Sequence, residues 1–134
     1  EYVNLYQLGN YMGNILVCSV DYAKRLHSAG CIQTSAFYWV DGKLCAWDSL
    51  PEVYSEIYSA YTVYELSVML GSMYYWIKYL VNTGLWYISG SMEGEMFDSQ
   101  ANANAEALLR FIHDSKLKIE DINNRFKKYI DGKL

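Results

Sequence analysis

Histidine, proline and cysteine are scarce in this chain of 134 residues, which contains two histidines, one proline and three cysteines. Cys18, Cys31 and Cys45 are odd in number and show no Cys-x-x-Cys spacing, a pattern that favours three reduced thiols over a disulfide framework. His27 and His113 each lie on an expected helix without neighbouring ligands at metal-binding spacing. We therefore expect no metal site and no cofactor.

Motifs that bind phosphate or activate a nucleophile are also missing. The sequence contains no phosphate-binding loop, no nucleophile elbow and no dinucleotide fingerprint. Glu93 and Glu95 flank Gly94 as a pair of carboxylates, but such a pair on a polar loop is usually only solvated. The sequence thus predicts a protein that is not an enzyme.

Long apolar runs are absent as well. The longest one, from Tyr74 to Val81, is interrupted by Lys78 and is too short to span a bilayer. No signal-peptide pattern is visible. We expect no membrane contact and a location in the cytoplasm of a bacterial host cell.

Charged residues make up only 19% of the chain, and the net charge is −4. From Arg110 onward seven Lys/Arg and four Asp/Glu give +3, whereas the four basic and eleven acidic residues before it give −7. A nucleic-acid binder needs a basic stripe, so direct binding of nucleic acid is not expected. The acidic body instead suits a basic protein partner.

Residues 60–90 contain the clearest structural signals, beginning with a capping box at Thr62 and Glu65. Apolar residues follow at helical spacing as far as Gly71, which suits a left-handed helix end. A run dense in aromatic and β-branched residues comes next. These signals predict a helix over 62–70, a strand over 73–81, a turn at 82–84 and a returning strand over 85–88.

An earlier segment has the same order of signals. Ser19 is suited to cap a helix that ends at Gly30, and Asp41-Gly42 is the strongest hairpin signal in the chain. The expected strands of this hairpin cover 33–40 and 43–47. The aromatic triplets at 37–39 and 74–76 occupy similar places, so either a weak internal duplication or coincidence explains the likeness.

The remaining segments complete a single α+β domain over residues 1–134. Residues 1–14 are either an extra arm or an edge strand, and Glu95–Asp98 is a candidate fifth strand. We expect an antiparallel sheet of four to five strands built from two helix–hairpin units, with helices packed on it. The two C-terminal helices are an alanine-rich one over 101–113, whose buried stripe is Ala101, Ala105, Leu108 and Ile112, and a basic one within 118–134.

Successive aromatic residues in each triplet place rings on both faces of the expected strands. One face can join the core, while the other needs a covering helix, a second subunit or a ligand. There are two alternatives for the second face. Either the chain's own helices cover it, or it is a face that binds a partner or forms a dimer.

The linking segment from Asp48 to Tyr61 mixes carboxylates with phenol rings. Carboxylates bind arginine bidentately and rings stack on its guanidinium, so this segment is a candidate surface for a basic partner. If it is extended, one face carries the candidate binding residues Glu52, Tyr54, Glu56 and Tyr58; if it is helical, one face carries Tyr54, Tyr58 and Tyr61. An ordinary solvated loop is the competing interpretation, and Glu93, Glu95 and Asp98 form an alternative acidic patch.

Three blocks of the sequence resemble a group of small acidic proteins carried by phages and other mobile elements of gut bacteria. The blocks are VCSVDYAKRLHSAGCIQTSAFYWV, AYTVYELSVMLG and ANANAEALLRFIHDSKL, within residues 17–117. They are similar to that group's first helix, Phe-Tyr-Trp strand, Thr-Val-x-Glu-Leu helix and alanine-rich helix. Gly71 stands where the group usually has proline, and residues 1–14 have no obvious counterpart. Because these blocks determine the fold, the resemblance carries over no active site.

The resemblance implies an accessory protein that acts inside a bacterial cell, and such proteins often inhibit host immunity. The leading hypothesis is a non-enzymatic, anti-CRISPR-like inhibitor whose carboxylates stand in for phosphates against the basic channel of a CRISPR effector nuclease. A second hypothesis is a sponge that holds a nucleotide immune signal between the aromatic hairpins, where only Lys43 and Lys78 could contact phosphate. A third is a structural or self-associating domain, such as a homodimer, without an inhibitory role.

Overall fold

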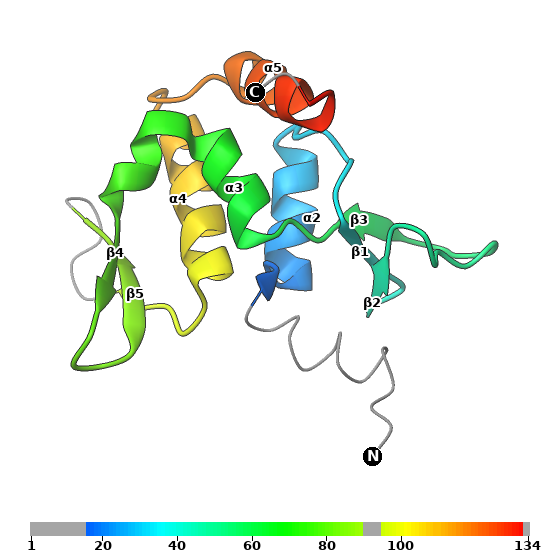
Figure 1. The fold of residues 1–134 in the computed structure, drawn as a ribbon, viewed down its shortest axis with the longest axis horizontal. Coiled ribbons are helices and arrows are strands. Elements are labelled where there is room, and N and C mark those ends of the chain that lie inside the picture. Colours follow the sequence, from blue (N-terminus) through cyan, green and yellow to red (C-terminus); the bar gives the residue numbers. More distant parts are fainter. Residues whose placement is uncertain (1–15, 90–94, 133–134) are drawn as a thin grey trace.

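Helices and antiparallel strands alternate along the chain, which confirms the predicted α+β class (Figure 1). The computed structural model describes residues 16–89 and 95–132, so the predicted arm or edge strand over 1–14 lies outside the described residues. In chain order the elements are α2 (Val20–Ser28), β1 (Phe37–Val40), β2 (Lys43–Ala46), β3 (Ile57–Ser59), α3 (Val63–Leu70), the 3-10 helix η1 (Gly71–Trp76), β4 (Ile77–Leu80), β5 (Leu85–Ile88), α4 (Gln100–His113) and α5 (Ile119–Ile130).

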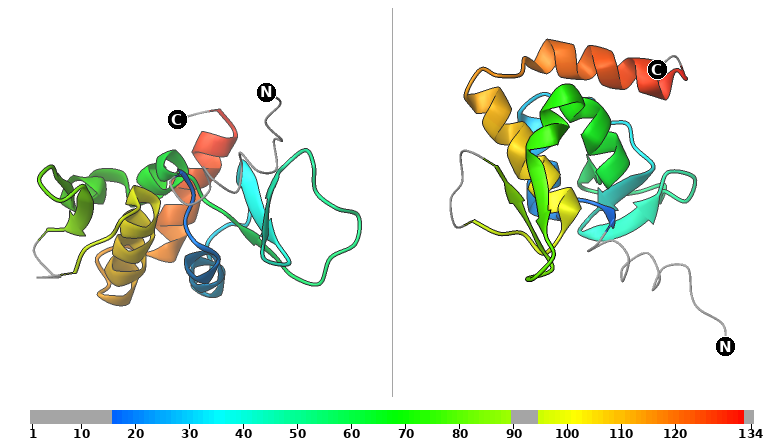
Figure 2. Two further views of the ribbon diagram at one scale, coloured as in Figure 1. Left: turned by 90° about the horizontal axis from the view of Figure 1, so that it is seen from below. Right: turned by 60° about the vertical axis from the view of Figure 1, so that its left-hand side comes forward.

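The helices form the centre of the molecule. α3 contacts both α4 and α5, and α2 contacts α4. Figures 1 and 2 show α5 lying across one end of the other three helices. In the part of the chain that the structure describes, no helix is long and apolar enough to cross a bilayer. The main core between the helices includes the fully buried side chains of Leu26, Leu66, Met69, Leu108, Ile122 and Phe126.

The described strands form two small sheets, so the prediction of one sheet with helices packed on it is wrong. One sheet has the order β2-β1-β3, and the other is the hairpin β4-β5; all pairs are antiparallel. Figure 1 shows the two sheets on opposite sides of the helices. The predicted number of strands is only roughly matched, and the helices keep the two hairpins apart.

The predicted strand over 73–81 is only half correct. Residues Gly71–Trp76 form η1, and the strand begins at Ile77. Its partner β5 is four residues long, and the last bond between the two segments runs from the Ser89 N–H to the Trp76 carbonyl. Within the described residues, those before Trp76 have no strand to pair with, and a 3-10 turn satisfies their backbone groups locally.

The segment proposed as a fifth strand, Glu95–Asp98, makes a single bridge instead. Phe97 exchanges two backbone hydrogen bonds with Trp86, at 2.7 and 2.8 Å. The strand that the sequence did not predict is β3, which comes from the linking segment and pairs with β1. That segment showed no strand pattern in the sequence.

Three of the signals at helix ends and turns are confirmed, whereas Gly71 ends α3 with φ 58° and ψ −131° rather than in the predicted left-handed helical conformation. The Ser19 hydroxyl caps α2, and Thr62 and Glu65 form the predicted capping box, with 2.8 Å from the Thr62 nitrogen to the Glu65 Oε1. Asp41 and Gly42 have φ values of 48° and 80°, as a type I′ hairpin turn requires.

Candidate functional site

A loop between β2 and β3 projects from the three-stranded sheet and contains three of the candidate binding residues, Glu52, Tyr54 and Glu56. We call residues 47–56 the projecting loop; Figures 1 and 2 show it extending away from the helices. Trp47 is 66% exposed, Val53 88% and Tyr54 45%. Asp48, Glu52 and Glu56 are also exposed. The predicted exposure of Glu52, Tyr54 and Glu56 is thus confirmed.

Hydrogen bonds fix the base of the projecting loop. The Asp41 carboxylate accepts from the backbone N–H groups of Ser55 at 3.1 Å and Glu56 at 2.9 Å. The Asp41 N–H in turn donates to the Glu56 carbonyl, and the Trp47 N–H donates to the Ala36 carbonyl. Both ends of the loop are therefore held to the sheet, which lowers the entropy that a partner would have to remove on binding.

Tyr58 differs from the other candidates because it is half-buried in β3. Its ring meets His27 of α2 edge-on, with the ring centroids 5.4 Å apart, and the Lys24 ammonium lies 5.8 Å from its centroid. Lys24 also pairs with Glu56 at 3.9 Å. Tyr58 and Glu56 therefore attach the end of the loop to α2, and the exposed rings left in the loop are those of Trp47 and Tyr54.

The linking segment is neither helical nor uniformly exposed. Ile57–Ser59 is a strand, so the extended alternative holds there. Tyr61 is fully buried: its hydroxyl donates to the Ile32 carbonyl, and its ring packs edge-on against Phe126 at 5.9 Å. The helical alternative, in which Tyr54, Tyr58 and Tyr61 share one face, is wrong.

The alternative acidic patch lies elsewhere. Glu95 forms an ion pair with Arg110 of α4 at 2.8 Å, and Asp98 is exposed beside it in sequence. Glu93 lies outside the described residues. The segment with Glu95 and Asp98 follows β5, on the opposite side of the helices from the projecting loop (Figure 1). The structure does not bring the two acidic groups together.

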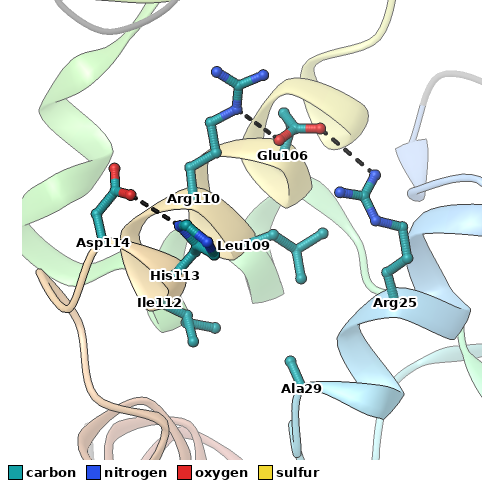
Figure 3. Close-up of a pocket in the computed structure, with 8 residues that line it drawn as sticks. All are labelled: Arg25, Ala29, Glu106, Leu109, Arg110, Ile112, His113 and Asp114. Carbon is teal, nitrogen blue, oxygen red and sulfur yellow. Dashed lines mark hydrogen bonds and ion pairs between the residues drawn. The ribbon is translucent and has the colours of Figure 1, made fainter.

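A pocket of about 600 Å³ between α2 and α4 was not foreseen from the sequence (Figure 3). Glu106 sits between two arginines, 2.8 Å from the Arg110 Nε and 3.6 Å from the Arg25 Nη1, and it accepts from the Tyr22 hydroxyl at 3.0 Å. The apolar lining of the pocket comes from Leu109, Ile112 and Ala29. The ion pair of Glu106 with Arg110 could have been predicted, because the two residues are four positions apart on one helix. The contact with Arg25 could not, because that residue is remote in the sequence.

The charges in this pocket neutralise one another. Burial alone would lower the pKa of Arg110, but hydrogen bonds and charge from Glu106 and Glu95 outweigh it and leave the pKa raised. Burial, followed by the neighbouring Glu106, raises the pKa of Tyr22 to about 12. Arg110 therefore stays protonated and Tyr22 stays a neutral phenol at physiological pH, and the contacts of both Tyr22 and Arg25 with Glu106 tie α2 to α4.

The described residues 16–89 and 95–132 contain no cluster of three His, Cys, Asp or Glu side chains that could hold a metal ion. His27 packs on Tyr58, and His113 is exposed beside Asp114. Comparison with protein-family models, curated proteins and solved structures finds no match for this chain.

Proposed function

We propose that this chain is a non-enzymatic inhibitor that binds a basic bacterial protein through the projecting loop. The observation that carries the proposal is the loop's combination of exposed Trp47, Val53 and Tyr54 with exposed carboxylates on a backbone held by Asp41. Tryptophan and tyrosine are the side chains that most often dominate binding energy at interfaces.

Apolar side chains and carboxylates have different tasks in this proposal. Trp47 and Tyr54 are the anchors that a partner pocket would desolvate, so they control the rate of dissociation. Asp48, Glu52 and Glu56 lie at the rim, where charges mainly steer the approach of a basic surface. The excess of acidic residues before Arg110 strengthens this steering over the whole body.

The resemblance to phage and mobile-element proteins suggests which basic partner to test first. A CRISPR effector nuclease holds nucleic acid in a positively charged channel. Carboxylates placed on a firm loop can occupy such a channel in place of phosphates. The inhibitor would then act by excluding the nucleic acid rather than by chemistry.

The proposal is tested by measuring cleavage by purified effector nucleases with and without the protein. Glu52→Lys combined with Glu56→Lys should slow association and weaken inhibition, and the effect should shrink as salt screens the charges. Tyr54→Ala and Trp47→Ala should instead speed dissociation. The matched control is Asp114→Lys combined with Asp131→Lys, which changes the net charge equally at exposed helix ends, where lysine is favourable.

Two results would count against the projecting loop. Full inhibition by the Trp47→Ala/Tyr54→Ala double variant would place the binding surface elsewhere. Loss of inhibition on reversing Glu95 and Asp98, with the loop intact, would move it to the alternative acidic patch. The melting temperature of the Trp47 and Tyr54 variants should stay that of the parent, because these side chains are exposed. Glu56→Lys also removes the exposed ion pair with Lys24, so the variant with both charge reversals is compared with the parent at a temperature where both are folded.

A further inference from the structure

The β4-β5 hairpin and the preceding η1 expose a second apolar surface. Tyr75, Tyr79 and Val81 are exposed there, and Trp76 is partly so. Lys78 is the one charged residue in the sequence from 66 to 89, and its ammonium lies 3.8 Å from the centroid of the Tyr75 ring. This end of an acidic molecule therefore carries no carboxylate between residues 66 and 89.

The outer edge of β4 is open within the described residues, because β4 pairs with β5 alone. Tyr79 lies opposite Trp86, and Trp86 uses its N–H and carbonyl for Phe97, on the side away from β4. In an antiparallel pair, opposite residues direct these groups either toward each other or both outward. The N–H and carbonyl of Tyr79 accordingly point away from β5, toward the open edge.

We infer that this edge pairs with the same edge of a second copy of the chain. Antiparallel pairing about a two-fold axis at Tyr79 would join two hairpins into one four-stranded sheet and satisfy the free backbone groups of both copies. Lys78 would then lie opposite Leu80 of the copy rather than opposite the other Lys78.

A second copy fits this surface better than a basic or an acidic partner does. Two molecules with net charge −4 repel each other, and the repulsion is smaller where the paired strands β4 carry no carboxylate and each contributes Lys78. The projecting loop lies on the opposite side of the helices and stays exposed in each copy (Figures 1 and 2). The inference does not rest on the proposed function.

Sedimentation equilibrium over a range of concentrations tests the inference. The parent should be a dimer, and Val81→Lys should raise its dissociation constant about tenfold or more, since about 1.4 kcal/mol corresponds to tenfold. The control is Val53→Lys, which adds the same charge at a residue of similar exposure, 88% against 81%, and should leave the dimer unchanged.

A backbone variant separates strand pairing from other contacts. Tyr79→Pro removes an N–H that β5 does not use, so the hairpin should persist while dimerisation is lost. Circular dichroism and the melting temperature check that the variant is folded. A parent that stays monomeric at all concentrations would overturn the inference. The inference would also be overturned if the folded Val81→Lys and Tyr79→Pro variants still formed the dimer. Dissociation of the dimer by the control Val53→Lys would overturn it as well.

Discussion

The guanidinium of Arg125 lies against Gly71, so closely that a Cβ on this glycine would stand 2.8 Å from the arginine Cζ. Arg125 donates to the Val68 carbonyl at 2.9 Å and to the Met69 carbonyl at 2.7 Å. The last turn of α3 contains no basic residue of its own. A side chain from α5 therefore caps α3, and the missing side chain at position 71 leaves room for it.

Gly71→Ala should lower the free energy of unfolding by about 1 to 3 kcal/mol, measured by urea denaturation. Gly71 has φ 58° and ψ −131°, a conformation that residues with a Cβ rarely adopt. The substitution also displaces Arg125. Because the end of an arginine side chain can move, we expect more than half of the cost to come from the backbone.

A double-mutant cycle with Arg125→Ala separates the two causes. The cost of Gly71→Ala should largely persist in the Arg125→Ala background. If it disappears there, the clash with the guanidinium is the cause and the backbone argument is wrong.

Glu65 should make the protein less stable as pH rises. Burial raises the pKa of its carboxyl above 4.5, although hydrogen bonds from Thr62 and Ala36 lower it in part. The folded state then binds the proton more tightly than the unfolded state. The stabilisation is complete below about pH 4.5 and is lost as pH rises through the folded pKa.

Urea denaturation of the parent and Glu65→Gln at a series of pH values measures this contribution. The stability of the parent relative to Glu65→Gln should fall with rising pH over that window. Thr62→Ala, which removes the other half of the capping box, should cost about 1 kcal/mol, and it should keep the direction of the pH dependence because the side chain that it removes lowers the pKa of Glu65. If the stability of the parent relative to Glu65→Gln grew with pH instead, the hydrogen bonds to the carboxylate would outweigh the effect of its burial.

Leu108→Ala and Ile112→Ala should differ in cost, although both were predicted to lie in the core. Leu108 is fully buried, and its truncation should cost about 2 to 5 kcal/mol. Ile112 is only half-buried because it lines the pocket between α2 and α4, so its truncation should cost less than about 2 kcal/mol. Thermal or urea unfolding measures both, and equal costs would contradict the observed burial.

Elements fixed by neighbouring residues could be predicted from the sequence. The capping box of Thr62 and Glu65 and the turn at Asp41-Gly42 need residues only a few positions apart. The α4 and α5 helices follow from apolar spacing in the same way. Each of these is found at the predicted place.

Long-range pairing could not be predicted. β3 is three residues long and owes its conformation to β1, which supplies its hydrogen bonds. Local β propensity suggested a strand through Tyr74 and Tyr75, but these residues form the 3-10 helix η1, and no strand in the described part of the chain pairs with them. In the projecting loop, Glu52, Tyr54 and Glu56 were identified from the sequence, whereas Trp47 was assigned to a strand and its exposure was missed.

Alkylation should distinguish the three cysteines, all of which are free thiols. Burial raises the pKa of Cys18 and of Cys31 to about 12, so neither forms the reactive thiolate at neutral pH. Cys45 is only half-buried, and its pKa is raised less. Iodoacetamide followed by mass spectrometry should find Cys45 labelled first in the native protein. Single labelling that persists in Cys45→Ser would contradict this order.

Glu106→Gln should destabilise the protein far more than Glu95→Gln, although both carboxylates pair with Arg110 at 2.8 Å. The Glu106 side chain is 9% exposed and the Glu95 side chain 45%. Loss of charge from the buried residue removes the carboxylate that pairs with Arg25 and leaves Arg110 with the exposed Glu95, and it should cost about 1 to 3 kcal/mol. Loss from the exposed residue should cost less than about 1 kcal/mol, because water and salt screen it.

Urea denaturation at low and high salt measures both costs. Salt should change the cost of Glu95→Gln and leave that of Glu106→Gln nearly constant.

Glu106→Gln should also lower the pKa of Tyr22 from about 12. NMR titration of labelled tyrosine can follow this pKa, and Tyr22→Phe assigns the signal. The stabilisation that comes from the raised pKa of Tyr22 is complete below the pKa of the unfolded phenol, near 10. The free energy of unfolding of the parent should therefore fall as pH rises from about 10 to about 12. Tyr22→Phe has no phenol to titrate at this position and should lack this fall. Equal costs for the two glutamates would mean that Glu106 is as well hydrated as Glu95, and the link between α2 and α4 would then rest on apolar packing alone.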